Sequence, residues 1–156
     1  MKILLVNKFY YPRGGDCMAM LAQEELFRSK GHEVAIFSMS HPENLPSEWD
    51  SYFAPEITFY GKGIIGRWKA LRRIFGIGAV KRSFIRLLND FHPDVVHLHN
   101  IHSYLSPVLA KLAHQRGCNV FWTMHDYKLV CPIYTCLSRG HTCERCFNDK
   151  SALLSR

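Results

Sequence analysis

Short apolar runs alternate with segments of helical periodicity through most of the chain. Four of the runs have the length and composition of strands that are buried on both faces of a parallel sheet. They cover residues 2–6, 33–38, 94–98 and 119–123, and a weaker candidate covers residues 57–60. Beyond residue 123 the periodicity ends in a stretch rich in Cys, Pro, Gly and polar residues.

Apolar residues at helical spacing predict helices between the strands. The three clearest stripes are Met18, Leu21, Ala22 and Leu26; Val80, Phe84, Leu87, Leu88 and Phe91; and Leu105, Val108, Leu109, Leu112 and Ala113. Gly31, Pro93 and Gly117 follow these stripes and act as helix stops. A further helix is expected around residues 68–75. This alternation predicts an α/β fold with a Rossmann-like, doubly wound and mostly parallel sheet.

The segments that follow the predicted strands are unusually polar and aromatic. They comprise residues 7–16, 97–102 and 124–127. In a doubly wound sheet, ligands bind in a crevice outside the carboxyl ends of the strands. We therefore expect these three segments to converge on one crevice.

Length and composition are those of one globular domain. A chain of 156 residues, of which 47% are hydrophobic, can build an independent core. No apolar run reaches the roughly 18 residues that suggest a transmembrane helix. The opening run, residues 3–6, is shorter than a signal-peptide core, and no small-residue cleavage site follows it. These features predict a cytoplasmic protein with reduced cysteines.

Positive charge is concentrated in one segment. The formal net charge is +7, and residues 57–89 contain no Asp or Glu. The cations there are Lys62, Arg67, Lys69, Arg72, Arg73, Lys81, Arg82 and Arg86. Such a patch favours a phospholipid surface, nucleic acid or a phosphorylated ligand, or it forms a solvated helix face. Because apolar residues lie among the cations, residues 62–86 suit peripheral contact with an anionic membrane, although the same apolar residues equally suit a protein core.

Gly14 and Gly15 lie between the first predicted strand and its helix. Glycine permits positive φ and lets a ligand approach the backbone, and the amides at a helix start attract anions. Two glycines are less than a complete dinucleotide-binding pattern, so a phosphate contact and a plain turn both fit. Asp16 either caps the helix or accepts a hydrogen bond from a sugar hydroxyl.

Histidines lie at the ends of the last two predicted strands. His97, His99 and His102 lie at the end of one strand, and His125 and Asp126 lie at the end of the next. Imidazoles in the crevice can hydrogen-bond sugar hydroxyls or transfer protons near neutral pH. A hydrogen-bonded structural role is the simpler interpretation for His97. A zinc site at these histidines lacks a carboxylate at suitable spacing.

Cysteines gather towards the end of the sequence. Cys131, Cys136, Cys143 and Cys146 form the pattern C-x4-C-x6-C-x2-C. Four thiolates match the tetrahedral preference of zinc, and a structural zinc ion would organise a segment that has almost no hydrophobic core of its own. An iron–sulfur cluster and disulfides are the alternatives. Cys17 and Cys118 are isolated and are expected to be small buried apolar groups.

Several motifs occur in a characteristic order over nearly the whole chain. They are MKILLVNKFYYPRGGD, KGHEVAIFS, PDVVHLHN and VFWTMHDYKLVCP. This ordered set resembles the N-terminal domain of family-four glycosyltransferases, which have the GT-B fold. The resemblance implies a retaining enzyme that transfers a sugar from a nucleotide-sugar donor to a glycan or lipid-linked acceptor, without an organic cofactor. It places the acceptor in this domain and the active site in the cleft beside a second, donor-binding domain.

The resemblance also assigns roles to individual residues. Gly14 and Gly15 would approach the donor diphosphate, and His125 would contact the donor sugar near the reacting centre. The residues expected to line the cleft or the acceptor site are Asp16, His99, Asn100, His102 and Asp126.

On this interpretation, residues 1–130 form the acceptor-side domain and residues 131–150 form a Cys-rich loop. The donor-binding domain of the family is absent from this chain, so we expect a fragment that has no transferase activity alone. Two other classes stay open: a stand-alone nucleotide-binding module and a zinc-containing nucleic-acid-binding protein. Nucleic acid is not an expected partner of a glycosyltransferase.

Overall fold

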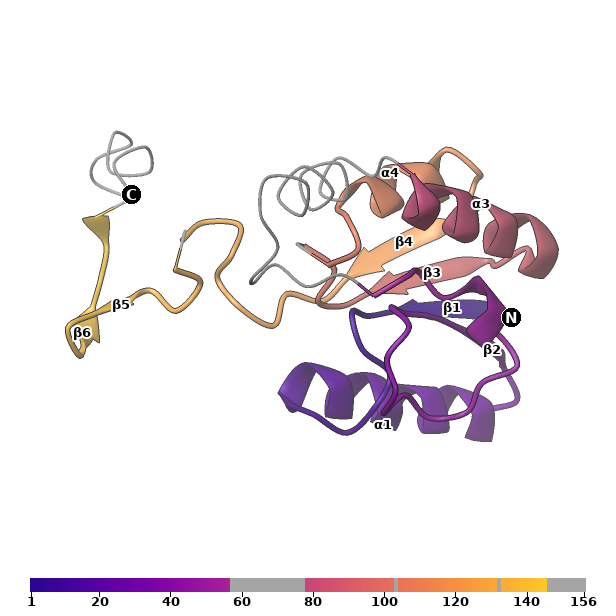
Figure 1. Ribbon diagram of the computed structural model, residues 1–156, viewed down its shortest axis with the longest axis horizontal. Helices are drawn as coiled ribbons and strands as arrows, with labels where there is room; N and C mark the ends of the chain where they lie inside the picture. Colours follow the sequence, from indigo (N-terminus) through magenta and orange to yellow (C-terminus); the bar gives the residue numbers. More distant parts are fainter. Residues whose placement is uncertain (57–77, 103, 132, 146–156) are drawn as a thin grey trace. The chain divides into compact units, whose positions relative to one another are not determined.

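A computed structural model describes residues 1–56, 78–102, 104–131 and 133–145 (Figure 1). The chain divides into two compact units, Met1–Thr123 and Met124–Arg156, and each is described by itself. The predicted strand at residues 57–60 and the predicted helix around residues 68–75 lie outside the described residues.

A parallel sheet forms the centre of the first unit. Within the described residues it contains four strands: β1 (Lys2–Val6), β2 (Glu33–Phe37), β3 (Val95–Leu98) and β4 (Asn119–Trp122). Their order in the sheet is β2-β1-β3-β4, and every pair is parallel. The predicted α/β, Rossmann-like fold is therefore confirmed, and the strand bounds agree with the apolar runs to within one residue.

The central strand β1 is apolar throughout because both of its faces are covered. Leu4 pairs with Ala35 of β2 on one side and with Val96 of β3 on the other, and all three are fully buried. Continuous apolar sequence is typical of such a position in a parallel sheet.

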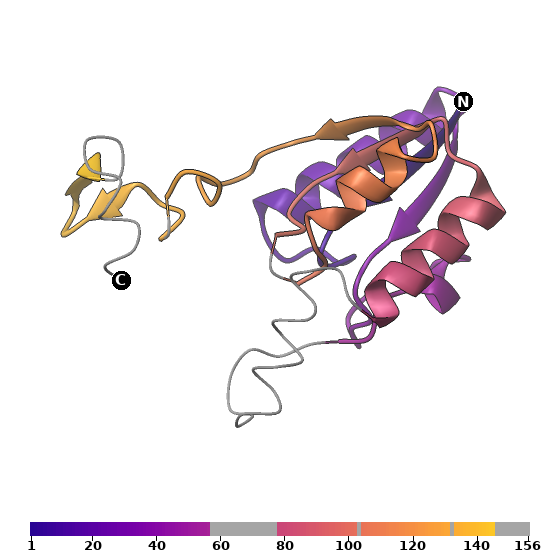
Figure 2. The same ribbon diagram turned by 90° about the horizontal axis from the view of Figure 1, so that it is seen from above.

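Helices cover the two faces of the sheet (Figure 1). Helix α1 (Gly15–Ser29) packs on one face, and α3 (Ala79–Phe91) and α4 (Val108–His114) pack on the other. Figure 2 shows α3 and α4 next to each other. A short 3-10 helix, η1 (Asp50–Tyr52), lies against α3 and β2.

The predicted stripes of α3 and α4 are confirmed. In α3 the buried residues are Val80, Phe84, Leu87, Leu88 and Phe91. Of the predicted stripe of α4 and the turn before it, Leu105, Leu109, Leu112 and Ala113 are buried and Val108 is half-buried against the core. Because the apolar stripe of α3 belongs to the core, this helix offers only its charged side, with Lys81 and Arg82 exposed, to any membrane.

The predicted apolar stripe of α1 is only partly buried. Leu21 packs against the core, whereas Met18 and Leu26 are 54% and 51% exposed. The buried residues are instead Cys17, Met20 and Glu24, which form a neighbouring stripe at helical spacing.

Glu24 occupies a core position because its carboxylate has two partners. The hydroxyl of Tyr10 donates towards its two oxygens, at 2.9 and 3.1 Å, and Nε of Arg28 donates at 3.1 Å. Burial and the Glu24 carboxylate raise the pKa of Tyr10, so the hydroxyl keeps its proton and remains a donor at neutral pH. Hydropathy patterns assign glutamate to the surface, so a glutamate that is paired in the core makes the buried face of α1 hard to predict.

The predicted helix stops after α1 and α4 are confirmed. Gly31 has a φ of 78° and Gly117 a φ of 79°, the left-handed conformation that glycine adopts without strain. Helix α3 ends at His92, which is left-handed itself and precedes Pro93.

A short hairpin in the second unit was not predicted. Strands β5 (Leu137–Ser138) and β6 (His141–Thr142) pair antiparallel. Arg139 and Gly140 form the turn and have φ values of 51° and 81°. Two positive φ values are typical of a two-residue hairpin turn, but the usual sequence signals are Asn-Gly and Asp-Gly. The Arg-Gly pair therefore gives little indication of the hairpin.

No helix in the described part of the chain is long and apolar enough to cross a membrane.

Candidate functional site

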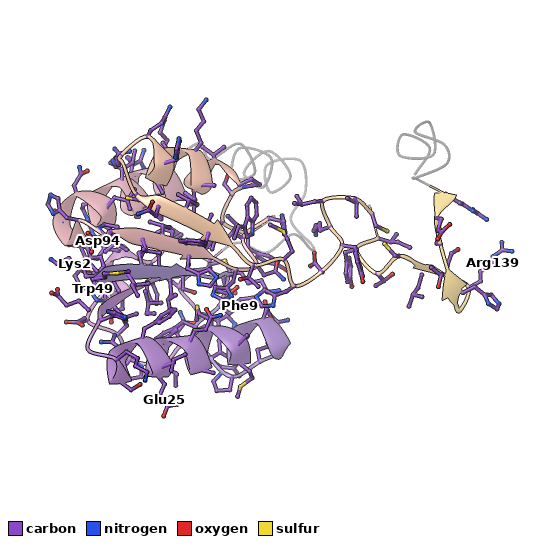
Figure 3. All side chains as sticks on the ribbon, turned by 180° about the vertical axis from the view of Figure 1, so that it is seen from behind. Lys2, Phe9, Glu25, Trp49, Asp94 and Arg139 are labelled. Atoms are coloured by element: carbon purple, nitrogen blue, oxygen red, sulfur yellow. The ribbon has the colours of Figure 1, made fainter. Side chains whose placement is uncertain are left out.

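The carboxyl ends of β1 and β3 meet at one edge of the sheet. Figure 3 shows Phe9 at this edge, between the end of β1 and the first turns of α1, and Lys2 and Asp94 at the opposite edge. The backbone amide of Lys8 donates to the carbonyl of Asn100 at 3.2 Å, which continues the pairing of the two strands. This edge is where a doubly wound sheet binds its ligands.

Asn7 organises this edge and was missed by the sequence analysis. Its side-chain oxygen accepts the backbone N–H of Asn100 at 3.1 Å. Its side-chain nitrogen donates to the carbonyl of Phe9 at 3.2 Å and to Sγ of Cys17 at 3.5 Å. The side chain is fully buried, so these partners satisfy it in place of water. The available signal was a single amide residue directly after an apolar strand.

The glycine turn has an ordinary backbone conformation. Gly14 is the N-cap of α1, with φ −159° and ψ 179°, and Gly15 is the first helical residue. Both values at Gly14 are extended, and neither glycine has the positive φ that would require glycine.

Packing does not require glycine at these positions either. In the described part of the chain, a Cβ atom at Gly15 would meet nothing within 4 Å. A Cβ atom at Gly14 would meet Oδ1 of Asp16 at 3.5 Å, which is an ordinary contact. Neither glycine is therefore needed for the turn or for its packing, and Gly15 is exposed at the start of a helix.

Asp16 does not cap the helix, which corrects one of the two expectations for it. Gly14 is the N-cap, and no side chain makes a capping hydrogen bond at this end of the helix. Asp16 lies in the first turn, where a carboxylate interacts favourably with the helix dipole. Its Oδ2 lies 3.2 Å from Nζ of Lys8, and both side chains are mostly buried. Lys8 thus offsets the negative charge that would otherwise disfavour a phosphate beside Asp16.

The Cys17 thiol lies just inside the same turn. Burial, and after it the Asp16 carboxylate, raise the pKa of Cys17. Cys17 is fully buried, and Cys118 is 7% exposed, as expected for small apolar groups. The protonated Cys17 thiol therefore packs under the glycine turn and supports it.

The histidines of β3 form a stacked pair. The rings of His97 and His99 lie 4.6 Å apart, so the two side chains share one face as predicted. Nε2 of His97 is 2.7 Å from Oγ1 of Thr123, the hydrogen bond expected of a structural histidine. His99 is fully buried, and its carbonyl accepts the indole N–H of Trp122 at 2.8 Å.

His102 and Asn100 complete this part of the edge. The ring of His102 is 9% exposed and packs at 5.1 Å from Trp122 of β4. Asn100 is half-buried, and its backbone is held by Asn7 and Lys8. The ends of β1, β3 and β4 are thereby joined, and the ligand roles of His99, Asn100 and His102 stay predictions.

A depression of about 940 Å³ lies beside the glycine turn, between the segments that follow β1 and β2. The rings of Tyr11 and His41 stack in its wall at 4.8 Å, and the guanidinium of Arg13 lies 4.5 Å from the ring of Phe9. Its lining residues are Tyr11, Pro12, Arg13, His41, Pro42 and Glu43. Sequence reasoning missed His41 because it lies in a polar loop that only the fold brings to this edge.

His125 and Asp126 belong to the second unit. Both are half-buried, and Oδ1 of Asp126 accepts the backbone N–H of Lys128 at 3.0 Å. That contact orders the turn that follows them. The prediction that His125 shares a hollow with Gly14 and Gly15 stays a prediction.

The predicted metal ligands are only partly described. Cys131, Cys136 and Cys143 lie in the second unit, and Cys146 lies outside the described residues. Among the described His, Cys, Asp and Glu side chains, no group of three converges closely enough to hold a metal ion.

A comparison with known families gives the class of protein. Residues 21–142 match the family described as Glycosyltransferase Family 4, which is more than half of the 156-residue chain. The chain therefore belongs to glycosyltransferase family 4, whose members use nucleotide-sugar donors. The matched range includes the ends of β3 and β4 as well as Cys131 and Cys136, and it begins after the glycine turn.

A curated relative occurs in Klebsiella pneumoniae, where it is described as an "Uncharacterized 42.6 kDa protein in cps region". It is 29% identical over 144 residues, which cover 85% of this chain and 38% of the relative. The chain thus corresponds to well under half the length of that protein.

Proposed function

We propose that this chain is the acceptor-side domain of a retaining glycosyltransferase in capsule polysaccharide synthesis. The enzyme transfers a sugar from a nucleotide-sugar to a glycan or lipid-linked acceptor. Family membership supports the donor class, and the relative from a cps region supports the pathway.

The observation that carries the proposal is the unconstrained glycine turn. Gly14 and Gly15 need neither positive φ nor extra packing space, so the turn itself does not explain them. A ligand that approaches the backbone would explain the two glycines, because a Cβ atom would stand between the ligand and the amides at the start of α1. Those amides carry the partial positive charge that favours a phosphate.

Lys8 makes the turn electrostatically suitable for a diphosphate. Its ammonium group lies 3.2 Å from Asp16, so the pair is close to neutral and leaves the positive field of the helix start in place. Asp16 is the proposed acceptor of a hydrogen bond from a sugar hydroxyl. The neighbouring depression with Tyr11, Arg13 and His41 is the proposed acceptor subsite.

His125 is the proposed contact to the donor sugar at the reacting centre. Imidazole hydrogen-bonds sugar hydroxyls and can stabilise charge that develops during transfer. Asp126 orders the following turn through the Lys128 amide and so supports the position of His125. The donor nucleotide is held mainly by a second domain, and we therefore propose that this chain alone is inactive.

A transfer assay tests the proposed function. The complete product of the gene is incubated with labelled nucleotide-sugars and with oligosaccharide or lipid-linked acceptors, and the anomeric configuration of the product is read by NMR. We expect transfer with retained configuration, and no transfer by the 156-residue chain alone. Inverted product, or no transfer with any nucleotide-sugar, would contradict the proposal. Micromolar binding of a nucleotide by the chain alone would favour a stand-alone binding module instead.

Peripheral membrane contact is part of the same proposal. It rests on the cations of residues 62–86, of which Lys81, Arg82 and Arg86 lie on described α3 and are exposed. Arg86 donates to the carbonyl of Ser51 at 2.9 Å, so Lys81 and Arg82 are the better candidates on this helix. Co-sedimentation should increase with the fraction of anionic lipid and decrease with salt, and binding that ignores lipid charge would exclude this contact.

A further inference from the structure

The depression beside the glycine turn contains a guanidinium group without a counter-charge. Arg13 lies in its lining and is exposed. Within the described residues, Arg13 forms no ion pair with a carboxylate. The nearby ammonium group of Lys8, in contrast, has Asp16 at 3.2 Å. Arg13 therefore retains its full positive charge for a ligand.

The ring of Phe9 positions this guanidinium. The two groups lie 4.5 Å apart, within the range of a cation–π interaction. Phe9 is 4% exposed, and its ring packs against the rings of Tyr11 at 5.4 Å and Tyr104 at 5.7 Å. A planar guanidinium that rests on a fixed ring loses less rotational freedom when it binds a ligand.

Hydrogen bonds hold the two walls of the depression together. The amide of Leu45 donates to the carbonyl of Tyr10 at 2.8 Å, and Oδ1 of Asn44 accepts the amide of Tyr10 at 3.2 Å. Pro12 and Pro42, one in each wall, have φ angles that their rings fix. The walls are therefore largely preformed, and a ligand binds with little reordering of the chain.

His41 contributes a second donor to the same lining. Its ring stacks on Tyr11, and Nδ1 accepts the backbone amide of Glu43 at 3.3 Å. The ring proton therefore lies on Nε2, which can donate to a ligand oxygen. The Glu43 side chain is 68% exposed, and its Oε2 lies 4.0 Å from Nδ1, so water screens this carboxylate from a bound anion.

We propose that this depression selects an acidic acceptor: Arg13 binds a carboxylate or phosphate group of the acceptor, and His41 donates to a hydroxyl of the sugar that carries it. This inference rests on the proposed function, because it takes the depression to be the acceptor subsite. The guanidinium fork matches two oxygens of a carboxylate or of a phosphate, which gives two parallel charge-assisted hydrogen bonds. A volume of about 940 Å³ also leaves room for neighbouring sugars of an oligosaccharide.

Binding of small glycosides by the full chain tests the proposal without a transfer assay. The ¹⁵N-labelled chain is titrated with methyl glucuronoside, methyl glucoside and inorganic phosphate, and the amide shifts of Arg13, His41 and Glu43 are followed by NMR. We expect the glucuronoside to bind at least about tenfold more tightly than the glucoside, as a hydrogen bond to a charged group predicts. Equal affinity for the two glycosides, together with binding of phosphate, would identify the anion as a phosphate of the acceptor.

Three variants show whether Arg13 carries the preference. Arg13→Gln should abolish the preference for the anion. Arg13→Lys keeps the charge but lacks the planar fork, so it should retain only part of the preference. Arg82→Gln is the matched control, since Arg82 is exposed on α3, on the face of the sheet opposite to α1. It should bind the three probes like the parent chain.

The complete gene product separates the acceptor from the donor. Arg13→Gln should raise the KM for an acidic acceptor at least about tenfold and leave the KM for the nucleotide-sugar unchanged. An increase in the KM for the nucleotide-sugar alone would assign Arg13 to the donor and overturn the proposal. A parent chain that binds both glycosides equally and does not bind phosphate would overturn it as well, as would a preference that survives Arg13→Gln. A gene product without transferase activity would contradict the proposed function, and the titration would still decide whether Arg13 selects anions.

Discussion

The side-chain oxygen of Asn7 accepts the backbone amide of Asn100 at 3.1 Å and so fastens the end of β1 to the end of β3. The same side chain donates to Phe9 and Cys17, which begin and end the connection that contains the glycine turn. One buried amide group thus positions the parts of the sheet edge where we place the substrates.

Asn7→Ala should destabilise the first unit. It leaves the amide of Asn100 and the carbonyl of Phe9 without these partners, at a cost of about 2–3 kcal/mol in the free energy of unfolding. Urea denaturation followed by tryptophan fluorescence measures it, because all three tryptophans precede residue 124. Asn119→Ala is the control, since exposed Asn119 makes one long contact of 3.4 Å, and it should cost less than about 0.5 kcal/mol. Equal losses for both variants would refute the role given to Asn7.

Tyr10→Phe should lower the free energy of unfolding, because it removes a hydrogen bond to the buried Glu24 carboxylate. The variant keeps the ring but removes a hydroxyl that lies 2.9 and 3.1 Å from the carboxylate oxygens. We expect a loss of about 1.5–3 kcal/mol in the same denaturation assay, as for hydrogen bonds to charged groups. Tyr52→Phe removes an exposed hydroxyl bound to Asp90 at 2.7 Å and should cost less than about 0.5 kcal/mol. A Tyr10 variant as stable as the Tyr52 variant would show that Arg28 alone satisfies Glu24.

Stability of the first unit should fall at alkaline pH. Burial raises the pKa of Tyr10, Tyr11, Cys17 and Cys118, so the folded state favours their neutral forms. This contribution is complete below the unfolded pKa values, about 8.5 for Cys and about 10 for Tyr, and is lost as the pH rises above them. Denaturation at pH 7, 8.5 and 10 should show a declining free energy of unfolding. Cys17→Ala should flatten the first part of the decline, and a parent curve that rises with pH would contradict this account.

The sheet was predictable because its strands are marked by local sequence. The apolar run of β1 is buried, and a short continuous apolar run is typical of a strand that is covered on both faces in a parallel sheet. The stripes of α3 and α4 were equally readable since their buried positions are all apolar.

The face of α1 and the arrangement of the sheet edge could not be predicted, because they depend on contacts between residues far apart in the sequence. The face of α1 was missed because Glu24 is held by Tyr10, which lies in another connection. Asn7 and His41 acquire their positions only when the loops after β1 and β2 meet at the sheet edge. Hydropathy and spacing contain no information on such pairings.

The central claim is that Gly14 and Gly15 leave space for the donor diphosphate, and Gly15→Val tests it most directly. A Cβ atom at Gly15 meets no atom of the described chain within 4 Å, so we expect the free energy of unfolding to change by less than about 1 kcal/mol. Ala79→Val, at the first residue of α3, is the matched control.

The decisive measurement is the KM for the nucleotide-sugar in the complete gene product, with the two variants compared at equal folded fraction. The account predicts that Gly15→Val raises this KM at least about tenfold, equivalent to about 1.4 kcal/mol of binding, while Ala79→Val leaves it unchanged. An unchanged KM in Gly15→Val would contradict it and would make the glycine pair an ordinary turn.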